Sequence, residues 1–201
     1  MIAAAVYQMA ARALFAPFGG IGALRRRAVD SLELRPGAKI LELGCGPGDM
    51  TAELLRRGAV VHAVDSSAAM LRVATERAPH AVFTHTDIRS YQPSTEFDAT
   101  LAAFVLHEIA PSEIPRVVRM AAASLAPRGR LVILDHAIPG GVDGALWRAV
   151  LYLVESSSID AWLALDLHRV LRNSGLVVLG DQPLAGGRAR MMIARQAGTS
   201  E

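Results

Sequence analysis

Cysteine and lysine are nearly absent from this sequence. Cys45 is the only cysteine and Lys39 the only lysine among 201 residues. A single thiol excludes an internal disulfide, so nothing in the chain asks for an oxidising compartment, and we expect a cytoplasmic protein. An excess of one charge is also lacking, because 21 basic residues face 19 acidic ones. The only run of three cations is 25–27, which disfavours nucleic acid as a substrate, since phosphate-binding grooves need many dispersed cations.

Long hydrophobic runs are missing as well. The apolar stretches among the first thirty residues are interrupted by Arg12 and a group of glycines before they reach the roughly 20 residues that span a bilayer. The basic run also follows the apolar part, the reverse of a secretory signal. We therefore expect neither a spanning segment nor a signal peptide. The composition of the whole chain, 52% hydrophobic and 20% charged, is typical of one globular domain.

Short aliphatic runs alternate with segments whose apolar residues recur at helical spacing. The runs expected as strands are 39–43, 60–64, 81–85, 97–103, 130–135, 176–179 and 190–195. The segments expected as helices are 49–58, 68–78, 112–126, 144–155 and 161–173. This alternation predicts an α/β fold, with parallel strands and crossover helices on both faces of the sheet. Gly186 and Gly187 leave a connection short enough for an antiparallel hairpin at the end.

A glycine-rich turn follows the first expected strand and opens a helix. It contains Gly44, Cys45, Gly46 and Gly48, in the context where a backbone can approach a cofactor closely. The spacing Gly-x-Gly-x-Gly matches neither the dinucleotide fingerprint nor the phosphate loop. Glu42 and Asp49 flank the turn, where carboxylates would oppose a pyrophosphate but favour a ligand with an ammonium and a sulfonium. S-adenosylmethionine carries both cations.

Acidic residues also end the next two expected strands. Asp65 follows the second strand and can accept hydrogen bonds from both ribose hydroxyls of an adenosine. Asp87 follows the third, where it could accept from the exocyclic amine of adenine, although such an aspartate is often only a loop or cap residue. Glu42, Asp65 and Asp87, which lie in this order at or near the ends of three successive expected strands, together indicate the cofactor more specifically than any one of them does alone.

Taken together, these stretches resemble the successive motifs of class I S-adenosylmethionine-dependent methyltransferases. The segments that carry the resemblance are Leu41 to Asp49, Val64 to Leu71, Thr86 to Ile88, Phe97 to Leu106 and Leu125 to Leu134. The resemblance implies a Rossmann-like, seven-stranded, mostly parallel sheet with a reversed last strand, and S-adenosyl-L-methionine as cofactor. Within the family, the chain is most similar to ubiquinone and menaquinone C-methyltransferases and to bacterial phospholipid N-methyltransferases.

The resemblance also implies roles for individual residues. The three glycines of the turn pass close to the methionine part, Asp65 binds the ribose, Met70 packs near the adenine, and Asp87 with Ile88 holds the adenine edge. The complete set expected to bind the cofactor is Glu42, Gly44, Cys45, Gly46, Gly48, Asp65, Ser66, Met70, Asp87, Ile88 and Phe104. We assign no metal ligands.

Two histidines are candidates for chemistry on the acceptor. Methyl transfer from a sulfonium is an in-line displacement, so a base is needed only if the acceptor loses a proton. His107, just past the fourth strand, and His136, at the end of the fifth, are the predicted catalytic residues, and His107 is also a predicted substrate contact. Each could instead be a hydrogen-bonded structural histidine, and Glu108 is expected to face solvent. The Asn/Asp-Pro-Pro-aromatic motif of base-specific aminomethyltransferases is absent at this place, which further disfavours nucleic acid.

The remaining expectations concern the two ends of the chain. Tyr7 lies where related enzymes have a Tyr-Asp pair over the cofactor, but Gln8 replaces the Asp; Tyr7 and Trp147 are predicted substrate contacts. The apolar N-terminal segment covers the core or, as an alternative, lies on a membrane surface. We expect one domain over 1–201, made of a helical cap (1–35), a cofactor-binding core (36–135) and substrate-side helices with a final hairpin (136–201).

The predicted function is therefore methyl transfer to an N, O, S or C atom of a small hydrophobic or lipid-like acceptor. One alternative keeps the cofactor but catalyses a cyclisation or rearrangement. A nicotinamide-dependent oxidoreductase is disfavoured by the glycine spacing and Glu42, and a binding module without activity would share the same fold. Neither the acceptor nor the oligomeric state follows from the sequence.

Overall fold

The computed structural model describes residues 15–154 and 159–197. In chain order, its elements are η1 (Ala16–Phe18), α2 (Gly20–Ser31), β1 (Lys39–Leu43), α3 (Asp49–Arg56), β2 (Val60–Asp65), α4 (Ala68–Arg77), β3 (Val82–His85), β4 (Phe97–Ala103), η2 (Leu106–Glu108), α5 (Ile114–Ala123), β5 (Leu125–His136), α6 (Gly141–Val154), α7 (Ile159–Leu163), α8 (Leu167–Asn173), β6 (Leu176–Leu184), η3 (Ala185–Gly187) and β7 (Ala189–Gln196). Tyr7 and the other residues up to 14, most of the N-terminal segment expected to cover the core or touch a membrane, lie outside the described residues.

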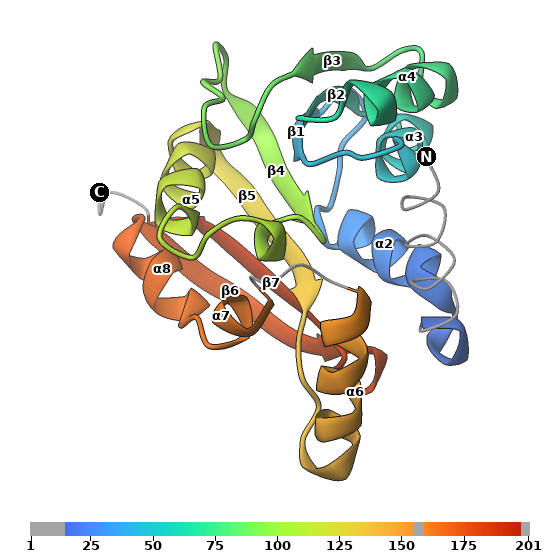
Figure 1. The fold of residues 1–201 in the computed structure, drawn as a ribbon. Helices are drawn as coiled ribbons and strands as arrows, with labels where there is room; N and C mark the ends of the chain where they lie inside the picture. The colour runs from blue at the N-terminus through green and yellow to red at the C-terminus, as the bar shows by residue number, and fades with distance from the viewer. Residues whose placement is uncertain (1–14, 155–158, 198–201) are drawn as a thin grey trace.

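The strands form one sheet in the order β3-β2-β1-β4-β5-β7-β6. Strands β1 to β5 run parallel, whereas β7 is antiparallel to both of its neighbours, β5 and β6. Helices α5 and α8 pack together on one side of the sheet, and α2 and α3 lie on the other (Figure 1). The predicted Rossmann-like sheet with a reversed last strand is confirmed.

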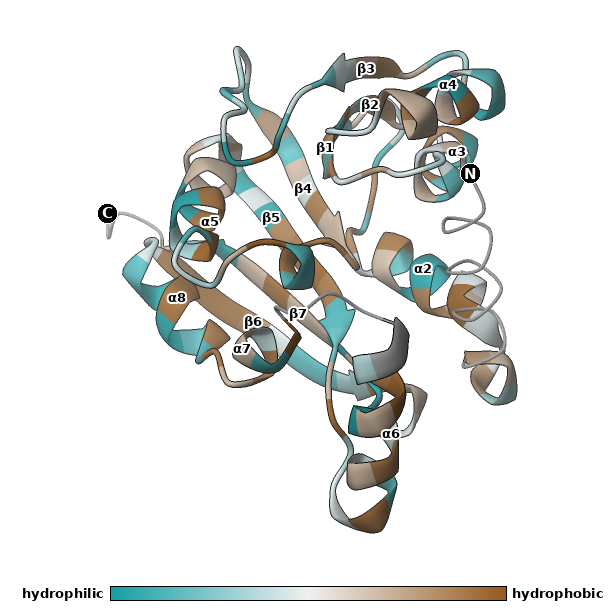
Figure 2. Cartoon of the chain, viewed as in Figure 1, coloured by the Kyte–Doolittle hydropathy of each residue, from teal (hydrophilic) through white to brown (hydrophobic). Residues whose placement is uncertain are grey.

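The burial of each strand follows its position in the sheet. The central strands β1 and β4 are buried along almost their whole length, as parallel strands covered on both faces must be. The edge strands β3 and β6 keep exposed positions instead. The hydropathy colouring shows brown segments in the inner strands β4 and β5 and also in the first part of the edge strand β6 (Figure 2).

Several expected boundaries were wrong, among them the end of β6, which is Leu184 rather than 179. The single helix expected at 161–173 is two helices, α7 and α8, because the side chain of Asp166 accepts a hydrogen bond from the Arg169 N–H and begins a new helix. Apolar spacing continues across the break and does not reveal it. Strand β5 begins at Leu125 rather than at 130, since it continues through Arg128, whose φ of +69° lies in the left-handed region.

The carboxyl ends of β1, β2, β4 and β5 meet at one edge of the sheet, and the strand order reverses between β1 and β4. In open α/β sheets, ligands bind outside the carboxyl ends of the strands at such a reversal. This edge is therefore where a site is expected. No helix of the described residues is long and apolar enough to cross a membrane.

Candidate active site

The turn between β1 and α3 uses its three glycines in different ways. Gly44, Gly46 and Gly48 all have positive φ, at +67°, +53° and +78°. A Cβ on Gly44 would lie 2.3 Å from the side chain of Val105, and one on Gly48 would lie 2.9 Å from the backbone of Ala74. A Cβ on Gly46 would meet no atom within 4 Å. Gly44 and Gly48 are thus needed for packing, whereas Gly46 faces open space, where a ligand can approach its backbone.

Asp65, the last residue of β2, holds this turn in place. Its carboxylate accepts hydrogen bonds from the backbone N–H of Gly46, at 2.7 Å, and of Ser67, at 2.8 Å. A carboxylate has about four acceptor positions, so two remain for a ligand. Asp65 can therefore accept from a pair of hydroxyls while it supports the glycine turn.

A cleft of about 410 Å³ opens over the turn. Its lining consists of Ile21, Arg25, Glu42, Gly44, Cys45, Gly46, Pro47, Met50, Asp65, Ser66, Ser67, Met70, Ala103, Phe104, Val105 and Glu108. Most residues predicted to bind the cofactor are among these. The exceptions are Gly48, Asp87 and Ile88.

The three exceptions have other surroundings in the structure. Gly48 packs against α4, as described above. Asp87 pairs with the guanidinium of Arg89, and the hydrogen bonds from that side chain lower the pKa of the Asp87 carboxyl. Ile88 is buried in the core. Contact of Asp87 and Ile88 with an adenine edge remains a prediction.

Glu42 is a buried acid at the bottom of the cleft. It is 3% exposed, and its carboxylate accepts a hydrogen bond of 2.7 Å from the Thr51 hydroxyl. Burial raises the pKa of Glu42 to about 7, although the Thr51 hydrogen bond and the charge of Arg25 act in the opposite direction. A cation bound nearby would favour the ionised form of this side chain.

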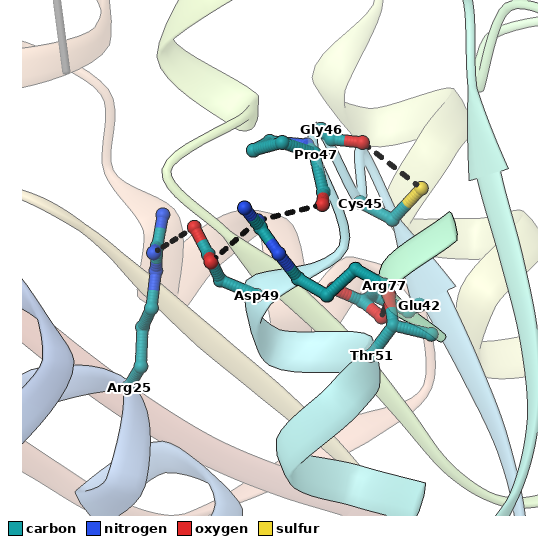
Figure 3. Close-up of polar contacts among 8 residues, drawn as sticks. All are labelled: Arg25, Glu42, Cys45, Gly46, Pro47, Asp49, Thr51 and Arg77. Atoms are coloured by element: carbon teal, nitrogen blue, oxygen red, sulfur yellow. Dashed lines mark hydrogen bonds and ion pairs between the residues drawn. The ribbon is translucent and has the colours of Figure 1, made fainter. Parts of the chain in front are cut away.

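Arg25 reaches the cleft from α2 and is tied to its rim. Its guanidinium lies 3.0 Å from the carboxylate of Asp49, which also binds Arg77 at 2.5 Å; Arg77 in turn donates to the Pro47 carbonyl at 2.8 Å (Figure 3). Asp49 therefore joins α2, α3 and α4 around the glycine turn. The sequence showed Arg25 only as part of a basic run, so its place in the cleft was missed.

The lining of the cleft fits S-adenosylmethionine. Glu42 and Asp65 supply negative charge near the glycine turn, which suits an ammonium and a sulfonium. The free acceptor positions of Asp65 suit ribose hydroxyls, and Arg25 suits a carboxylate. The open space over Gly46 is what a close backbone contact requires. A pyrophosphate would instead meet the two acids.

A second cavity, of about 710 Å³, lies on the neighbouring part of the sheet. Strand pairing places Ile133 opposite Met192 and Asp135 opposite Arg190, and these side chains share one face because alternate residues of a strand point the same way. Helix α7 and the segment after it contribute Trp162, Leu163, Leu165 and Leu167 to the lining, and α6 contributes Arg148. The lining thus combines apolar side chains with the charged groups of Asp135, Arg148, Asp181 and Arg190.

A cluster of rings separates the two cavities. Phe104 lines the first and His136 the second, and their ring centroids are 5.1 Å apart. Phe104 has a φ of +53°, an uncommon conformation for a bulky residue and one that concentrates at functional sites. Phe15 packs against both rings. Groups bound in the two cavities would lie on either side of these rings, which must move aside for one group to reach the other.

Asp135 and His107 form a buried pair behind His136. His107 is fully buried, and its Nδ1 lies 2.6 Å from Asp135 Oδ1. The same carboxylate accepts from the backbone N–H of Leu106, His107 and His136. Burial alone would raise the pKa of Asp135, but the charge and hydrogen bond of His107 outweigh it, and the pKa lies below its ordinary value. Asp135 therefore fixes the orientation of the His107 ring.

The same three residues have the spacing of a metal site. Candidate ligand atoms of His107, Asp135 and His136 all lie within 4.8 Å of one another. Both oxygens of Asp135, however, already accept four N–H groups between them, which uses its acceptor capacity. A cation would have to displace these donors, so the geometry favours a hydrogen-bonded pair over a metal centre.

His107, His136 and Trp147, which were predicted for chemistry or substrate contact, lie near one another but have different surroundings. His136 lines the second cavity, and its ring lies 4.7 Å from that of His107, which lines neither cavity. Trp147 is buried, donates to the Ala137 carbonyl and packs on Phe15. Glu108 is exposed, as expected, at the edge of the cofactor cleft. Asp135 was missed, although it ends a strand just as Asp65 does.

Comparison with known proteins agrees with the cofactor cleft. Residues 40–129 match the family described as "Methyltransferase domain". An uncharacterized methyltransferase of Synechocystis is 26% identical over 195 residues, which cover 94% of this chain and 91% of the relative. The trans-aconitate 2-methyltransferase of Mycobacterium tuberculosis is 34% identical over 117 residues, which cover 57% of this chain but only 42% of that protein. The chain thus spans less than half of the latter.

The fold is shared with solved structures. Magnesium protoporphyrin IX methyltransferase from Synechocystis, solved with bound S-adenosylhomocysteine, superimposes with a TM-score of 0.69. The two chains are 17% identical, and the match covers 88% of this chain and 84% of the other. At this identity, the likeness concerns the fold.

Proposed function

Because this chain is a class I S-adenosylmethionine-dependent methyltransferase, we propose that it methylates a small hydrophobic or lipid-like acceptor held in the second cavity. The observation that carries the proposal is the pair of neighbouring cavities, which share the wall of Phe104 and His136. One cavity suits a charged nucleoside cofactor, and the other has the room and the apolar side chains to hold a small molecule.

The size and lining of the second cavity support the acceptor class. A volume of about 710 Å³ is within the ordinary range for small-molecule sites. Asp181 and Arg190 are paired with each other in its lining, and the hydrogen bonds from Arg190 lower the pKa of Asp181 to about 2. Because these charges offset one another, the cavity has no surplus of cations for a polyanion.

The reaction we propose is an in-line displacement. The cofactor supplies a methyl group on a sulfonium, and the protein holds the acceptor atom in line with it, which can supply much of the rate enhancement. Arg25, Glu42 and Asp65 hold the cofactor, and the lining of the second cavity holds the acceptor. The acceptor can be an N, O, S or C atom.

His136 is the residue we place nearest to the acceptor. It lines the second cavity, and a neutral imidazole there can take a proton from an acceptor that must lose one. His107 lines neither cavity and acts through His136, with Asp135 holding its ring. We expect His136→Ala to lower kcat strongly and to leave the Kd for S-adenosylhomocysteine within a few fold. A large loss of cofactor affinity would instead mark His136 as structural.

A matched pair of substitutions on one turn tests the acceptor cavity. Leu163→Trp adds volume inside the cavity, whereas Ala164→Trp adds the same ring at the exposed neighbouring position. With an acceptor found by screening hydrophobic compounds for S-adenosylhomocysteine release, we expect about a tenfold rise in acceptor KM for Leu163→Trp only. Calorimetry with S-adenosylhomocysteine should give the same Kd for both. Equal effects of the two variants would refute the assignment of the cavity.

A reaction other than methyl transfer on the same cofactor is the second candidate. The cleft would bind S-adenosylmethionine in either case, so its lining does not separate the two. Product analysis does. One S-adenosylhomocysteine formed per product molecule supports transfer, and product formed without it would establish a cyclisation or rearrangement.

A further inference from the structure

His136 lies at the end of β5, where the sheet no longer surrounds the strand. Strand β4, its neighbour on one side, pairs with β5 only as far as Ala103 and Leu134. On the other side, the Ala137 N–H donates to the Arg188 carbonyl at 3.1 Å. The carbonyl of His136 belongs to the same trans peptide as that N–H and points the opposite way, toward the side where β4 has ended. Because His136 is only 6% exposed, this carbonyl needs a partner from outside the sheet.

Trp162 of α7 supplies that partner. Its indole Nε1–H donates to the His136 carbonyl at 2.9 Å, and the bond is buried. An indole has one donor and no acceptor, so this bond uses its whole hydrogen-bonding capacity. The backbone N–H of His136 is held in turn by the Asp135 carboxylate at 2.7 Å. Both backbone polar groups of His136 are therefore fixed by side chains rather than by neighbouring strands.

The place of the His136 ring depends on this backbone. The ring packs among others, with the centroid of Phe104 at 5.1 Å and that of His107 at 4.7 Å. Its direction from the strand follows the Cα–Cβ bond, and therefore the peptide that Trp162 holds. A carbonyl that lost the indole would turn toward another donor, since a buried acceptor without a partner is unfavourable. The imidazole would then leave its place at the second cavity.

The other tryptophan of the sequence offers a contrast. Trp147 of α6 donates to the next carbonyl along the chain, that of Ala137, at 3.1 Å. Trp162 lines the second cavity, whereas Trp147 does not. Both indoles hold the backbone at the end of β5, but Trp162 is the one that connects the acceptor side of the molecule with His136.

We propose that Trp162 is a positioning residue for methyl transfer, which holds His136 toward the acceptor through its backbone carbonyl. This rests on the proposed role of His136 as a base. Trp162 itself takes no proton. Its ring lines the second cavity, so a direct contact with the acceptor is the competing role, and the two roles predict different kinetics. Loss of a positioning residue lowers kcat, whereas loss of an acceptor contact raises KM.

The test uses Trp162→Phe, which removes the indole N–H and keeps an aromatic ring. The matched control is Gln196→Leu, which removes a side-chain donor to the Ala122 carbonyl, at 2.8 Å, and lines neither cavity. With a methylated hydrophobic acceptor, we expect Trp162→Phe to lower kcat about tenfold and to change the acceptor KM less than about threefold. Gln196→Leu should change both by less than about twofold.

A double-mutant cycle separates positioning from a general loss of structure. If Trp162 acts through His136, its substitution has no base left to displace in the His136→Ala background. We expect Trp162→Phe to change kcat there by less than about twofold. Nuclear Overhauser contacts between the imidazole of His136 and the ring of Phe104 give a readout without turnover. They should weaken in Trp162→Phe and persist in Gln196→Leu.

Three results would overturn the proposal: an unchanged kcat in Trp162→Phe, a rise in acceptor KM alone, or a loss of kcat that is equally large with and without His136. Calorimetry with S-adenosylhomocysteine confirms that each variant is folded. The same measurements keep the two proposals apart. If His136→Ala retains full kcat while the ring contacts still weaken in Trp162→Phe, the proposed role of His136 has failed although Trp162 holds it. If His136→Ala lowers kcat and Trp162→Phe does not, only the assignment of Trp162 has failed.

Discussion

The two cavities of this protein are built in different ways. The cofactor cleft is formed largely by backbone turns in three short stretches, 42–50, 65–70 and 103–108, with α2 closing one side. The second cavity is formed by side chains spread from Ile133 to Met192 on three strands and the helices between them. The family match covers residues 40–129 and ends before the first residue of the second cavity.

The difference shows what each cavity constrains. A cleft made of backbone demands particular conformations, such as the positive φ of Gly44 and Gly46, and few residues can supply them. A cavity made of side chains on a strand face can change its shape by substitution without moving the backbone. We therefore expect substitutions in the first to affect folding and cofactor binding together, and substitutions in the second to affect mainly the acceptor.

The largest expected effect concerns Asp135. This residue lines the second cavity, but we expect its substitution to affect folding. It belongs to the second cavity, but it accepts four N–H groups and joins β5 to η2. We expect Asp135→Ala to lower the free energy of unfolding by about 3–5 kcal/mol, because buried donors and His107 lose their partner. Urea unfolding monitored by circular dichroism measures this.

Asp181→Ala is the control for that experiment. Asp181 also lines the second cavity and pairs with Arg190 and His168, but its side chain is 28% exposed. Its loss should cost about 1 kcal/mol or less, since water screens such pairs. If the two variants had the same free energy of unfolding, Asp135 would contribute no more to folding than Asp181 does.

The second test concerns the stability of the cofactor cleft. Because the pKa of Glu42 in the folded chain is about 7, above the ordinary 4.5, the fold favours the protonated form. Stability from this group is therefore present at low pH and is lost as the pH rises through that range. We expect Glu42→Gln to be more stable than the wild type above about pH 8, by up to about 3 kcal/mol, with the difference vanishing near about pH 4.

The same substitution should weaken cofactor binding about tenfold, since a bound cation stabilises the ionised carboxylate. Unfolding at several pH values and calorimetry with S-adenosylmethionine measure the two effects. A variant that gained stability at every pH equally would show that the titration of Glu42 is not the cause. If Glu42→Gln is more stable than the wild type only at high pH and binds the cofactor more weakly, the ionised Glu42 lowers the stability of the fold but strengthens cofactor binding.

The smallest expected effects come from two alanines in the glycine turn. Gly44→Ala should lower the free energy of unfolding by about 2–3 kcal/mol, because its Cβ would overlap Val105. Gly46→Ala should cost only about 1 kcal/mol, from backbone strain, yet raise the Kd for S-adenosylhomocysteine about tenfold by filling the open space. Equal losses of stability would mean that Gly46, too, is needed for packing.

The parts of the molecule that depend on local sequence could be predicted. The boundaries of β1 and β4, the glycine turn and the place of Asp65 follow from patterns within a few residues. Arg25 could not be placed, because it reaches the cleft only through the docking of α2. The second cavity depends on the register of β5, β7 and β6, which fixes that Ile133 meets Met192. Asp135 carried the same signal as Asp65, but its importance depends on the nearness of His107.

The ion pair between Arg25 and Asp49 has a consequence for the speed of turnover. It joins α2 to the rim of the cofactor cleft, and its side chains are 27% and 36% exposed. Such pairs contribute at most about 1 kcal/mol, so thermal motion breaks them constantly. One edge of the cleft is thus closed by a weak, partly exposed ion pair. Its floor is fixed by the hydrogen bonds of Glu42 and Asp65. We therefore expect used cofactor to leave along that edge without disturbing the sheet, and salt to hasten its departure.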